Sequence, residues 1–339
     1  SGIIRRYGGA RVLQATGVLL MISLLVAASG STWLVVLSAL IMGAAIGPHV
    51  SAIMHLLARA TPVHRLGTIV SFSQAGGAIG VGIAGVVIPP LILSLGWQAT
   101  MVGLSLFGLA YALAIHPRRK ALDDDRQPHY PISLSLAALL QPLWQAARDR
   151  VLREIMLASL VLSMLYQTLV GFLVSYLNLE LGFSLVVAGL VLAASQIAAV
   201  LARVFLGWLA DRLRDPFIVL SGVGYGAMAT GLAVAIVTPG WPVWLLCTIA
   251  AGYGITCSGW VGTALGAMVA SSPREKVASA TSSLQFVMLI GGMVGPLLFA
   301  AVASLSGRYA TAYVAFAALA LVVGWRMMRL RRRVRRRRA

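Results

Sequence analysis

Arg203 is the charged residue of this sequence that is best placed to take part in binding. It lies about six residues inside an otherwise apolar stretch, residues 184–208. A charged side chain in hydrocarbon costs roughly 2.5–3.5 kcal/mol on insertion scales, so Arg203 should face protein or water. Gln196 precedes it by seven residues and therefore lies on the same face of a helix. Arg203 could contact a substrate, or it could snorkel or pair with an acid such as Asp211 or Asp215.

Further candidates for a binding site are polar side chains in other apolar stretches. His49, beside Pro48, could titrate near neutral pH or could simply hydrogen-bond to its neighbours. An internal repeat, described below, places His49 and Trp260 at equivalent positions. The remaining candidates are Gln74, Gln285 and Tyr166. A cavity lined by Arg203 and His49 would be positive on balance, which favours an anionic substrate.

The sequence indicates no other kind of active site. The interiors of the apolar stretches lack Asp and Glu, and Cys247 and Cys257 fit no metal or redox spacing. The pattern contains no nucleotide-binding loop, nucleophile triad or metal-binding cluster. We therefore expect no cofactor, no metal and no catalytic residue, and a membrane enzyme is disfavoured.

Long apolar segments must position these residues. Hydrophobic residues make up 59% of the 339 residues and charged residues only 11%, whereas a soluble domain carries about 25% charged residues. Runs of about 20 apolar residues can cross the ~30 Å hydrocarbon core as helices. The sequence therefore predicts an all-α integral membrane protein. The ten predicted spans are 10–29, 33–57, 67–93, 98–115, 154–178, 184–208, 217–237, 242–269, 277–304 and 309–328.

The basic residues predict how the spans are oriented. The formal net charge is +18, and 25 of the 27 Lys and Arg residues fall in alternate connections and at the C-terminus. The opposite connections hold Arg308, and Arg203 lies within a span. By the positive-inside rule, the basic connections and the C-terminus are cytoplasmic. We expect a multi-pass protein of the cell membrane, whose terminal arginines attract anionic lipid rather than nucleic acid.

A repeat with an offset of 211 positions divides the chain into two related halves. It superposes Gln74 on Gln285 and Gly96 on Gly307. Such halves place a substrate site between them, near the middle of the bilayer. The second half has six predicted spans and the first has four, so two preceding helices are expected to be missing. The expected domains are a partial first half (1–115), a cytoplasmic linker with an amphipathic segment (116–153), a six-helix half (154–328) and a basic tail (329–339).

Two loops carry a resemblance to a known family. The segment from Gly207 through Asp211 to Arg212 reads Gly-Trp-Leu-Ala-Asp-Arg and resembles the G-x-L-A-D-R signature of the major facilitator superfamily. The first eleven residues resemble the longer first copy of that signature, with Arg5 in place of its Asp and Arg6 following. Ser1 replaces the first Gly of that copy. The resemblance implies a twelve-helix fold, of which this chain would supply helices 3 to 12.

The residue types of the signature loop suggest a physical role for it. Its glycine would let helices cross closely, and the Asp211 carboxylate could meet a helix N-terminus or an Arg. Such contacts, made in one conformation and broken in another, would latch a gate at the cytoplasmic side. A static loop anchor is the alternative. Arg5 in place of the acid should weaken the latch of the first half.

The resemblance covers the whole chain and implies a secondary transporter. Arg203 is placed like the helix-8 arginine that binds the substrate carboxylate in monocarboxylate transporters, although Ala199 stands where their acid is expected. We therefore expect alternating-access transport of a small organic anion by a monomer, with a proton as a candidate coupling ion. Efflux of amphipathic drugs or metabolites is the alternative, and a non-transporting sensor derived from this fold is a third interpretation.

Overall fold

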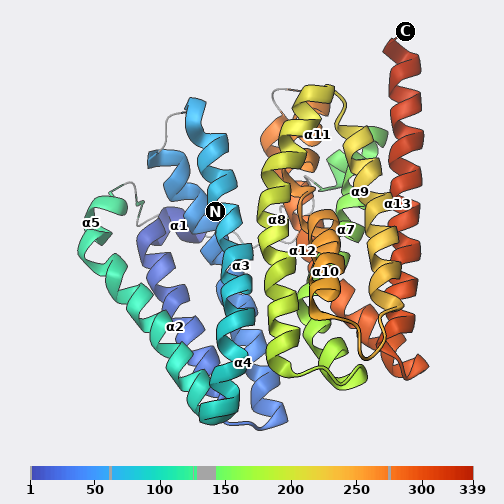
Figure 1. Ribbon diagram of the computed structural model, residues 1–339. Coiled ribbons are helices and arrows are strands. Elements are labelled where there is room, and N and C mark those ends of the chain that lie inside the picture. The colour runs from blue at the N-terminus through green and yellow to red at the C-terminus, as the bar shows by residue number, and fades with distance from the viewer. Residues whose placement is uncertain (1, 61–62, 125, 128–142, 274–275, 339) are drawn as a thin grey trace. The chain divides into compact units, whose positions relative to one another are not determined.

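The computed structural model describes residues 2–60, 63–124, 126–127, 143–273 and 276–338, and over these residues it contains helices and no strands (Figure 1). This confirms the predicted all-α class. Within the described residues, nine helices are long and apolar enough to cross a membrane. One of them, α4 (Val63–Ile115), contains two predicted spans because its helical course breaks at Gly96, where φ is 79°. Each of the ten predicted spans thus corresponds to helical structure.

The packing of the chain separates two units. Unit 1 comprises residues 1–74 and 87–134, and unit 2 comprises residues 75–86 and 135–339. Residues 75–86 were expected in the first half. They join unit 2 because Gly85 brings the backbone of α4 against Gly189 of the helix that contains Arg203. The predicted amphipathic segment of the linker falls largely on residues 128–142, which lie outside the described residues.

Unit 1 packs two long helices against the second part of α4. Its other elements are α1 (Gly2–Tyr7), α2 (Gly9–Ala27), α3 (Thr32–Ala60), the 3-10 turn η1 (His116–Arg118) and α5 (Arg119–Leu122). Ile4, Val12 and Ala52 are buried together in a small apolar core. Trp97, directly after the break in α4, donates its indole N–H to the Ala27 carbonyl at 3.0 Å. This bond satisfies a carbonyl at the end of α2 that has no partner within its own helix.

The carboxylate of Asp123 closes one end of unit 1. It accepts hydrogen bonds from the backbone N–H groups of Ala10 (2.7 Å) and Arg11 (3.1 Å). These groups begin α2 and lack intrahelical partners, and a helix N-terminus favours a negative charge. Gly8 permits the approach, because its φ is 94° and a Cβ at this position would overlap Asp123. Asp124 next to it pairs with Arg59 at the end of α3.

Unit 2 contains a larger buried core. Its elements are α7 (Arg150–Ser175), the π-helical turn η2 (Tyr176–Glu180), α8 (Leu185–Leu213), α9 (Pro216–Ala235), α10 (Val243–Ser258), α11 (Val261–Ser271), α12 (Val277–Ser306) and α13 (Tyr309–Arg338). Tyr313 lies at the centre of an aromatic cluster, with its ring 5.2 Å from that of Tyr176 and 4.9 Å from that of Phe299. Helices α8 and α10 cross so closely that a Cβ on Gly254 would overlap the Ser195 carbonyl.

The basic residues expected to form a tail continue α13 as a helix to Arg338, beyond the ends of its neighbours in unit 2 (Figure 1). This helix keeps an apolar face past the predicted span, since Met327 and Leu330 are buried and Val334 packs against the same core. The exposed face carries Arg329, whose guanidinium lies 3.5 Å from the centre of the Trp325 ring. The segment is therefore an amphipathic end of α13.

Ion pairs hold this amphipathic end to the rest of unit 2. Arg326 forms two hydrogen bonds of 2.8 Å with the Glu154 carboxylate at the start of α7. Arg331 and Arg335 lie 2.7 and 3.3 Å from the Asp215 carboxylate, which precedes α9. These contacts offset the repulsion among neighbouring arginines, which opposes helix formation.

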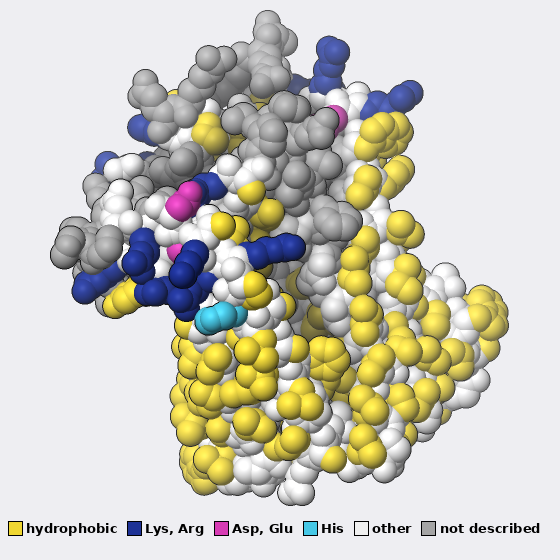
Figure 2. Space-filling model, turned by 90° about the vertical axis from the view of Figure 1, so that its left-hand side faces the viewer, with side chains coloured by type: hydrophobic (Ala, Val, Ile, Leu, Met, Phe, Trp, Pro, Cys, Tyr) yellow, Lys and Arg dark blue, Asp and Glu magenta, His cyan; other side chains and the backbone are white. Residues whose placement is uncertain are grey.

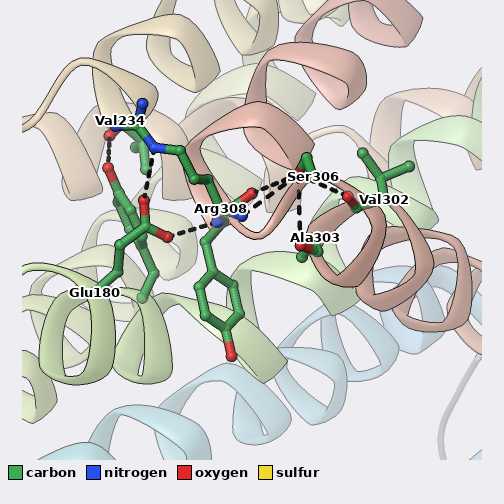
Figure 3. Close-up of polar contacts among 8 residues, drawn as sticks. Glu180, Val234, Val302, Ala303, Ser306 and Arg308 are labelled. Atoms are coloured by element: carbon green, nitrogen blue, oxygen red, sulfur yellow. Dashed lines mark hydrogen bonds and ion pairs between the residues drawn. The ribbon is translucent and has the colours of Figure 1, made fainter.

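At the opposite end of unit 2, Glu180 caps the start of α13 (Figure 3). Its carboxylate accepts a hydrogen bond of 2.5 Å from the backbone N–H of Tyr309 and lies 3.8 Å from Arg308. Ser306 fixes the preceding turn, because its hydroxyl donates to the Val302 carbonyl at 2.8 Å. The Glu180 contacts attach η2, which follows α7, to the start of α13.

The face of the molecule drawn in Figure 2 is divided by polarity. On the face drawn in Figure 2, hydrophobic side chains cover the lower part, and Lys, Arg, Asp, Glu and His side chains gather above them. Large exposed apolar residues of unit 1 include Leu25, Leu40, Leu106 and Phe107. An apolar surface of this kind is stable in lipid, where hydrocarbon replaces water around the helices. The separation is typical of a multi-pass membrane protein.

Candidate functional site

Arg203 is held by a serine that the sequence analysis did not single out. Its side chain is half-buried on α8, and its Nε and one terminal nitrogen lie 3.3 and 2.9 Å from the Ser258 hydroxyl oxygen. Ser258 is 1% exposed and is the last residue of α10. The C-terminal end of a helix favours a cation, so α10 supports the guanidinium by its dipole as well as by this hydroxyl.

The helix that carries Ser258 is interrupted directly after it. Gly259 and Trp260 separate α10 from α11 within one candidate membrane span, Val243–Ser271, which matches the predicted span 242–269. Gly259 is required there, because a Cβ would lie 2.7 Å from a Leu206 methyl and 2.9 Å from the Ala202 Cβ. The backbone stays in the right-handed helical region at both residues (φ −69° and −76°), so the interruption is a local one within a single span.

Two of the predicted site residues lie next to Arg203. Tyr166 on α7 donates its hydroxyl to the Gln196 side-chain oxygen at 3.5 Å, and the same hydroxyl interacts with the Arg203 guanidinium. Gln196 is buried and donates to the Ser195 hydroxyl at 3.2 Å. Helices α7, α8 and α10 thus bring a cation, an amide and two hydroxyl groups together within unit 2. We refer to Tyr166, Gln196, Arg203 and Ser258 as the Arg203 cluster.

The other predicted site residues are placed differently. Trp260 is 1% exposed, and its indole N–H donates to the Cys257 carbonyl at 2.8 Å. It supports the interruption after α10 from within the core and does not line a surface in this conformation. Gln285 has an exposed side chain on α12. Gln74 belongs to unit 1, and its side chain lies outside the described residues.

His49 is half-buried in α3 of unit 1. Its Nδ1 atom lies 3.0 Å from the Thr16 hydroxyl of α2, and its ring centre lies 5.5 Å from that of Tyr111 on α4. Pro48 precedes it inside the helix, where proline removes a backbone hydrogen bond. Three helices of unit 1 therefore meet around this imidazole.

The predicted gating residues of the second half lie at the end of α8. Asp211 and Arg212 are exposed, and the Arg212 guanidinium lies 5.4 Å from the Trp208 ring centre. Among the described residues, a Cβ on Gly207 would meet nothing within 4 Å. The close crossing expected at this glycine stays a prediction, and the tight approach on α8 within unit 2 occurs at Ser195, against α10.

The predicted gating residues of the first half lie in α1. The Arg6 guanidinium is 5.6 Å from the Tyr7 ring centre, and the Arg5 side chain lies outside the described residues. The acidic residues that make tertiary contacts near these two loops are Asp123 and Asp215. Asp123 accepts a hydrogen bond from the start of α2, and Asp215 pairs with Arg331 of α13. Asp215 was recognisable from sequence, because an Asp followed by Pro and an apolar run is a helix-start signal.

Comparisons with known proteins agree with this architecture. The family model described as Major Facilitator Superfamily matches residues 1–269 and 155–339. A Haemophilus influenzae protein described as a metabolite transport protein is 26% identical over 226 residues, which are 65% of this chain and 56% of that protein. The chain thus spans about half the length of this curated relative.

Three solved structures show a similar fold. The nucleoside transporter NupG has a TM-score of 0.75 at 15% identity, with 97% of this chain and 85% of that chain covered. The peptide transporter POT has a TM-score of 0.72 at 15% identity, with 98% and 83% covered. The E. coli fucose:proton symporter FucP has a TM-score of 0.59 at 17% identity, with 97% and 86% covered. Identities this low indicate a shared fold and do not identify a substrate.

Proposed function

Because the chain belongs to the major facilitator superfamily, whose members are transporters and not enzymes, we propose that it moves a small organic anion that binds Arg203. The observation that carries this proposal is the half-buried guanidinium of Arg203, which is oriented by the Ser258 hydroxyl. Ser258 and Tyr166 are neutral hydrogen-bond partners that orient the guanidinium.

A carboxylate is the group that fits this arrangement best. The planar guanidinium presents parallel N–H donors that match the two oxygens of a carboxylate. Hydrogen bonds to charged groups contribute about 1.5–3 kcal/mol each, enough to offset part of the cost of keeping Arg203 away from water. The Tyr166 hydroxyl and the Gln196 amide would add polar contacts to the rest of a small substrate.

The interruption after α10 supports an alternating-access cycle. Ser258 lies at this interruption and also contacts Arg203, so a substrate that draws the guanidinium away acts directly on the end of α10. A few residues at the end of a helix can absorb large changes in φ and ψ, as in hinges of other proteins. We propose that substrate binding is transmitted to α11 by this route.

The proposal also covers how the protein lies in the membrane and how many copies transport requires. The basic connections and the C-terminus face the cytoplasm, in accord with the 25 of 27 basic residues on that side. Anionic lipid neutralises exposed arginines near the start of the amphipathic end of α13, such as Arg329. A single copy carries the transport pathway, and a proton is the coupling ion.

An apolar pocket supports efflux of amphipathic compounds as the second candidate. It has a volume of about 250 Å³ and lies between α8, α9 and α10 of unit 2. Leu206, Leu213 and Val223 line it, and its polar member is Thr256. The Thr256 hydroxyl already bonds the Gly252 and Tyr253 carbonyls at 3.1 Å, so the pocket suits a hydrocarbon group.

Uptake by the full-length protein in proteoliposomes tests the anion proposal. The probes are radiolabelled lactate as the anion and radiolabelled fucose and uridine as neutral solutes. We expect lactate uptake that Arg203→Gln lowers at least tenfold, which corresponds to about 1.4 kcal/mol. Arg333→Gln, which removes the same charge from the exposed face of α13, should keep wild-type uptake. Equal uptake by the two variants, or uptake of the neutral probes alone, would contradict the proposal.

A further inference from the structure

His49 is a titratable side chain inside an apolar span of unit 1. It is eight residues from the end of the apolar span Thr32–Leu57, or ~12 Å along a helix. The sequence places its Asp and Glu residues outside the interiors of the apolar spans, so a carboxylate of this chain is not available at this depth. Imidazole is the side chain that ordinarily exchanges a proton near neutral pH.

The hydrogen bonds around Thr16 determine which ring nitrogen of His49 carries hydrogen. The Thr16 hydroxyl donates to the Leu13 carbonyl at 2.9 Å. A hydroxyl has one hydrogen and two lone pairs. With the Thr16 hydrogen on the Leu13 carbonyl, the 3.0 Å contact with His49 Nδ1 uses a Thr16 lone pair, and its hydrogen comes from Nδ1. Neutral His49 therefore has its free lone pair on Nε2.

From this arrangement we infer that His49 Nε2 is a proton-binding site and that its proton accompanies the substrate anion. Protonation at Nε2 leaves the bond from Nδ1 to Thr16 in place, so the ring gains a charge without changing its partner. One proton carried with one monovalent anion moves no net charge. This inference rests on the proposed transport function.

The titratable and charged groups near His49 come from three helices of unit 1. On α4 the titratable residue in contact with it is Tyr111, and on α2 its partner is Thr16, which does not titrate. His116 lies nearer the basic end of unit 1, where its Nδ1 contacts the Gln14 amide at 3.3 Å. On its own helix, His55 and Arg59 follow toward the same end. Arg59 forms an ion pair with Asp124 at that end.

Nuclear magnetic resonance tests the proton site without any substrate. The full-length protein, labelled with ¹³C,¹⁵N-histidine, is placed in lipid nanodiscs, and His49→Asn identifies the signals of His49. Nitrogen shifts distinguish hydrogen on Nδ1 from hydrogen on Nε2. We expect the Nδ1–H form at high pH and a doubly protonated ring at lower pH, within about pH 5–8. An Nε2–H form, or no titration in this range, would overturn the inference.

Transport by the His49→Asn variant tests whether His49 couples proton movement to lactate movement. The Asn amide can still donate to Thr16 but cannot titrate. With radiolabelled lactate in proteoliposomes, His49→Asn should lose accumulation driven by a pH gradient and should keep exchange of internal for external lactate. His55→Asn is the matched control on the same helix and should keep both. Gradient-driven accumulation by His49→Asn would overturn the coupling role.

The two experiments separate this inference from the function on which it rests. If wild-type protein moves no lactate in either assay, the anion proposal fails, and the spectra still decide whether His49 binds a proton. If lactate exchange occurs and His49 does not titrate, the anion proposal stands and the proton site is wrong.

Discussion

Arg331 and Asp215 form a hydrogen-bonded ion pair of 2.7 Å that ties the amphipathic end of α13 to the start of α9. Asp215 is also the N-cap of α9, where its other carboxylate oxygen accepts from the Ile218 N–H at 3.3 Å. In unit 1, the corresponding helix start is capped by Asp123, which comes from the segment after α5. A carboxylate thus completes a helix N-terminus in each unit, but it belongs to the capped helix in only one of them.

Asp215 should therefore contribute to stability through two separable interactions. Asp215→Asn keeps an oxygen for the cap and loses the ion pairs, at a cost of roughly 1–3 kcal/mol for a largely buried charged contact. Asp215→Ala also loses the cap, which costs about 1 kcal/mol more. Thermal unfolding in detergent, followed by tryptophan fluorescence, measures the order. The exposed Asp211→Asn should unfold like wild type, and a loss of stability equal to that of Asp215→Asn would contradict this assignment.

The signature loops should differ in their effect on transport. Asp211 retains the acid of the signature, whereas Arg5 stands in its place in the first half. We expect Asp211→Asn to slow lactate uptake more than Arg5→Asn, because only the former removes a carboxylate that can latch a gate. The comparison uses initial rates at equal amounts of reconstituted protein. Equal rates for the two variants would show that the loops are equivalent.

Ser258 should act on substrate through Arg203. Ser258→Ala removes the oxygen that receives two guanidinium N–H groups, and we expect the KM for lactate to rise roughly tenfold, about 1.4 kcal/mol. The matched control is Ser159→Ala, because the buried Ser159 hydroxyl makes no hydrogen bond within the described part of the chain. A rise in KM shared by both variants would assign the effect to packing.

The crossing of α8 and α10 should tolerate no side chain at Gly254. Gly254→Ala would push the two helices apart at Ser195, and overpacking of this kind costs about 1–3 kcal/mol. Gly262→Ala is the control, because no described residue lies within 4 Å of a Cβ there and alanine is the better helix former by about 1 kcal/mol. Unfolding temperatures should fall for the first variant and hold or rise for the second.

The spans were predictable because long apolar runs leave helices as the remaining choice in lipid. The shared face of Gln196 and Arg203 was predictable for a similar reason, since helical periodicity fixes it. Ser258 could not be recognised, because a serine in an apolar helix is equally satisfied by a carbonyl one turn earlier. The role of Asp123 could not be predicted, because it contacts a helix start 113 residues away and local sequence signals do not indicate such pairs.

Because α13 is one continuous helix, the C-terminal arginines move together with the last membrane span. A helix of 30 residues is about 45 Å long, so a tilt of about 10° would swing its tip through roughly 8 Å. A small rearrangement of the spanning helices would therefore appear, magnified, at the far tip of α13. A spin label at Arg336 could read that displacement directly.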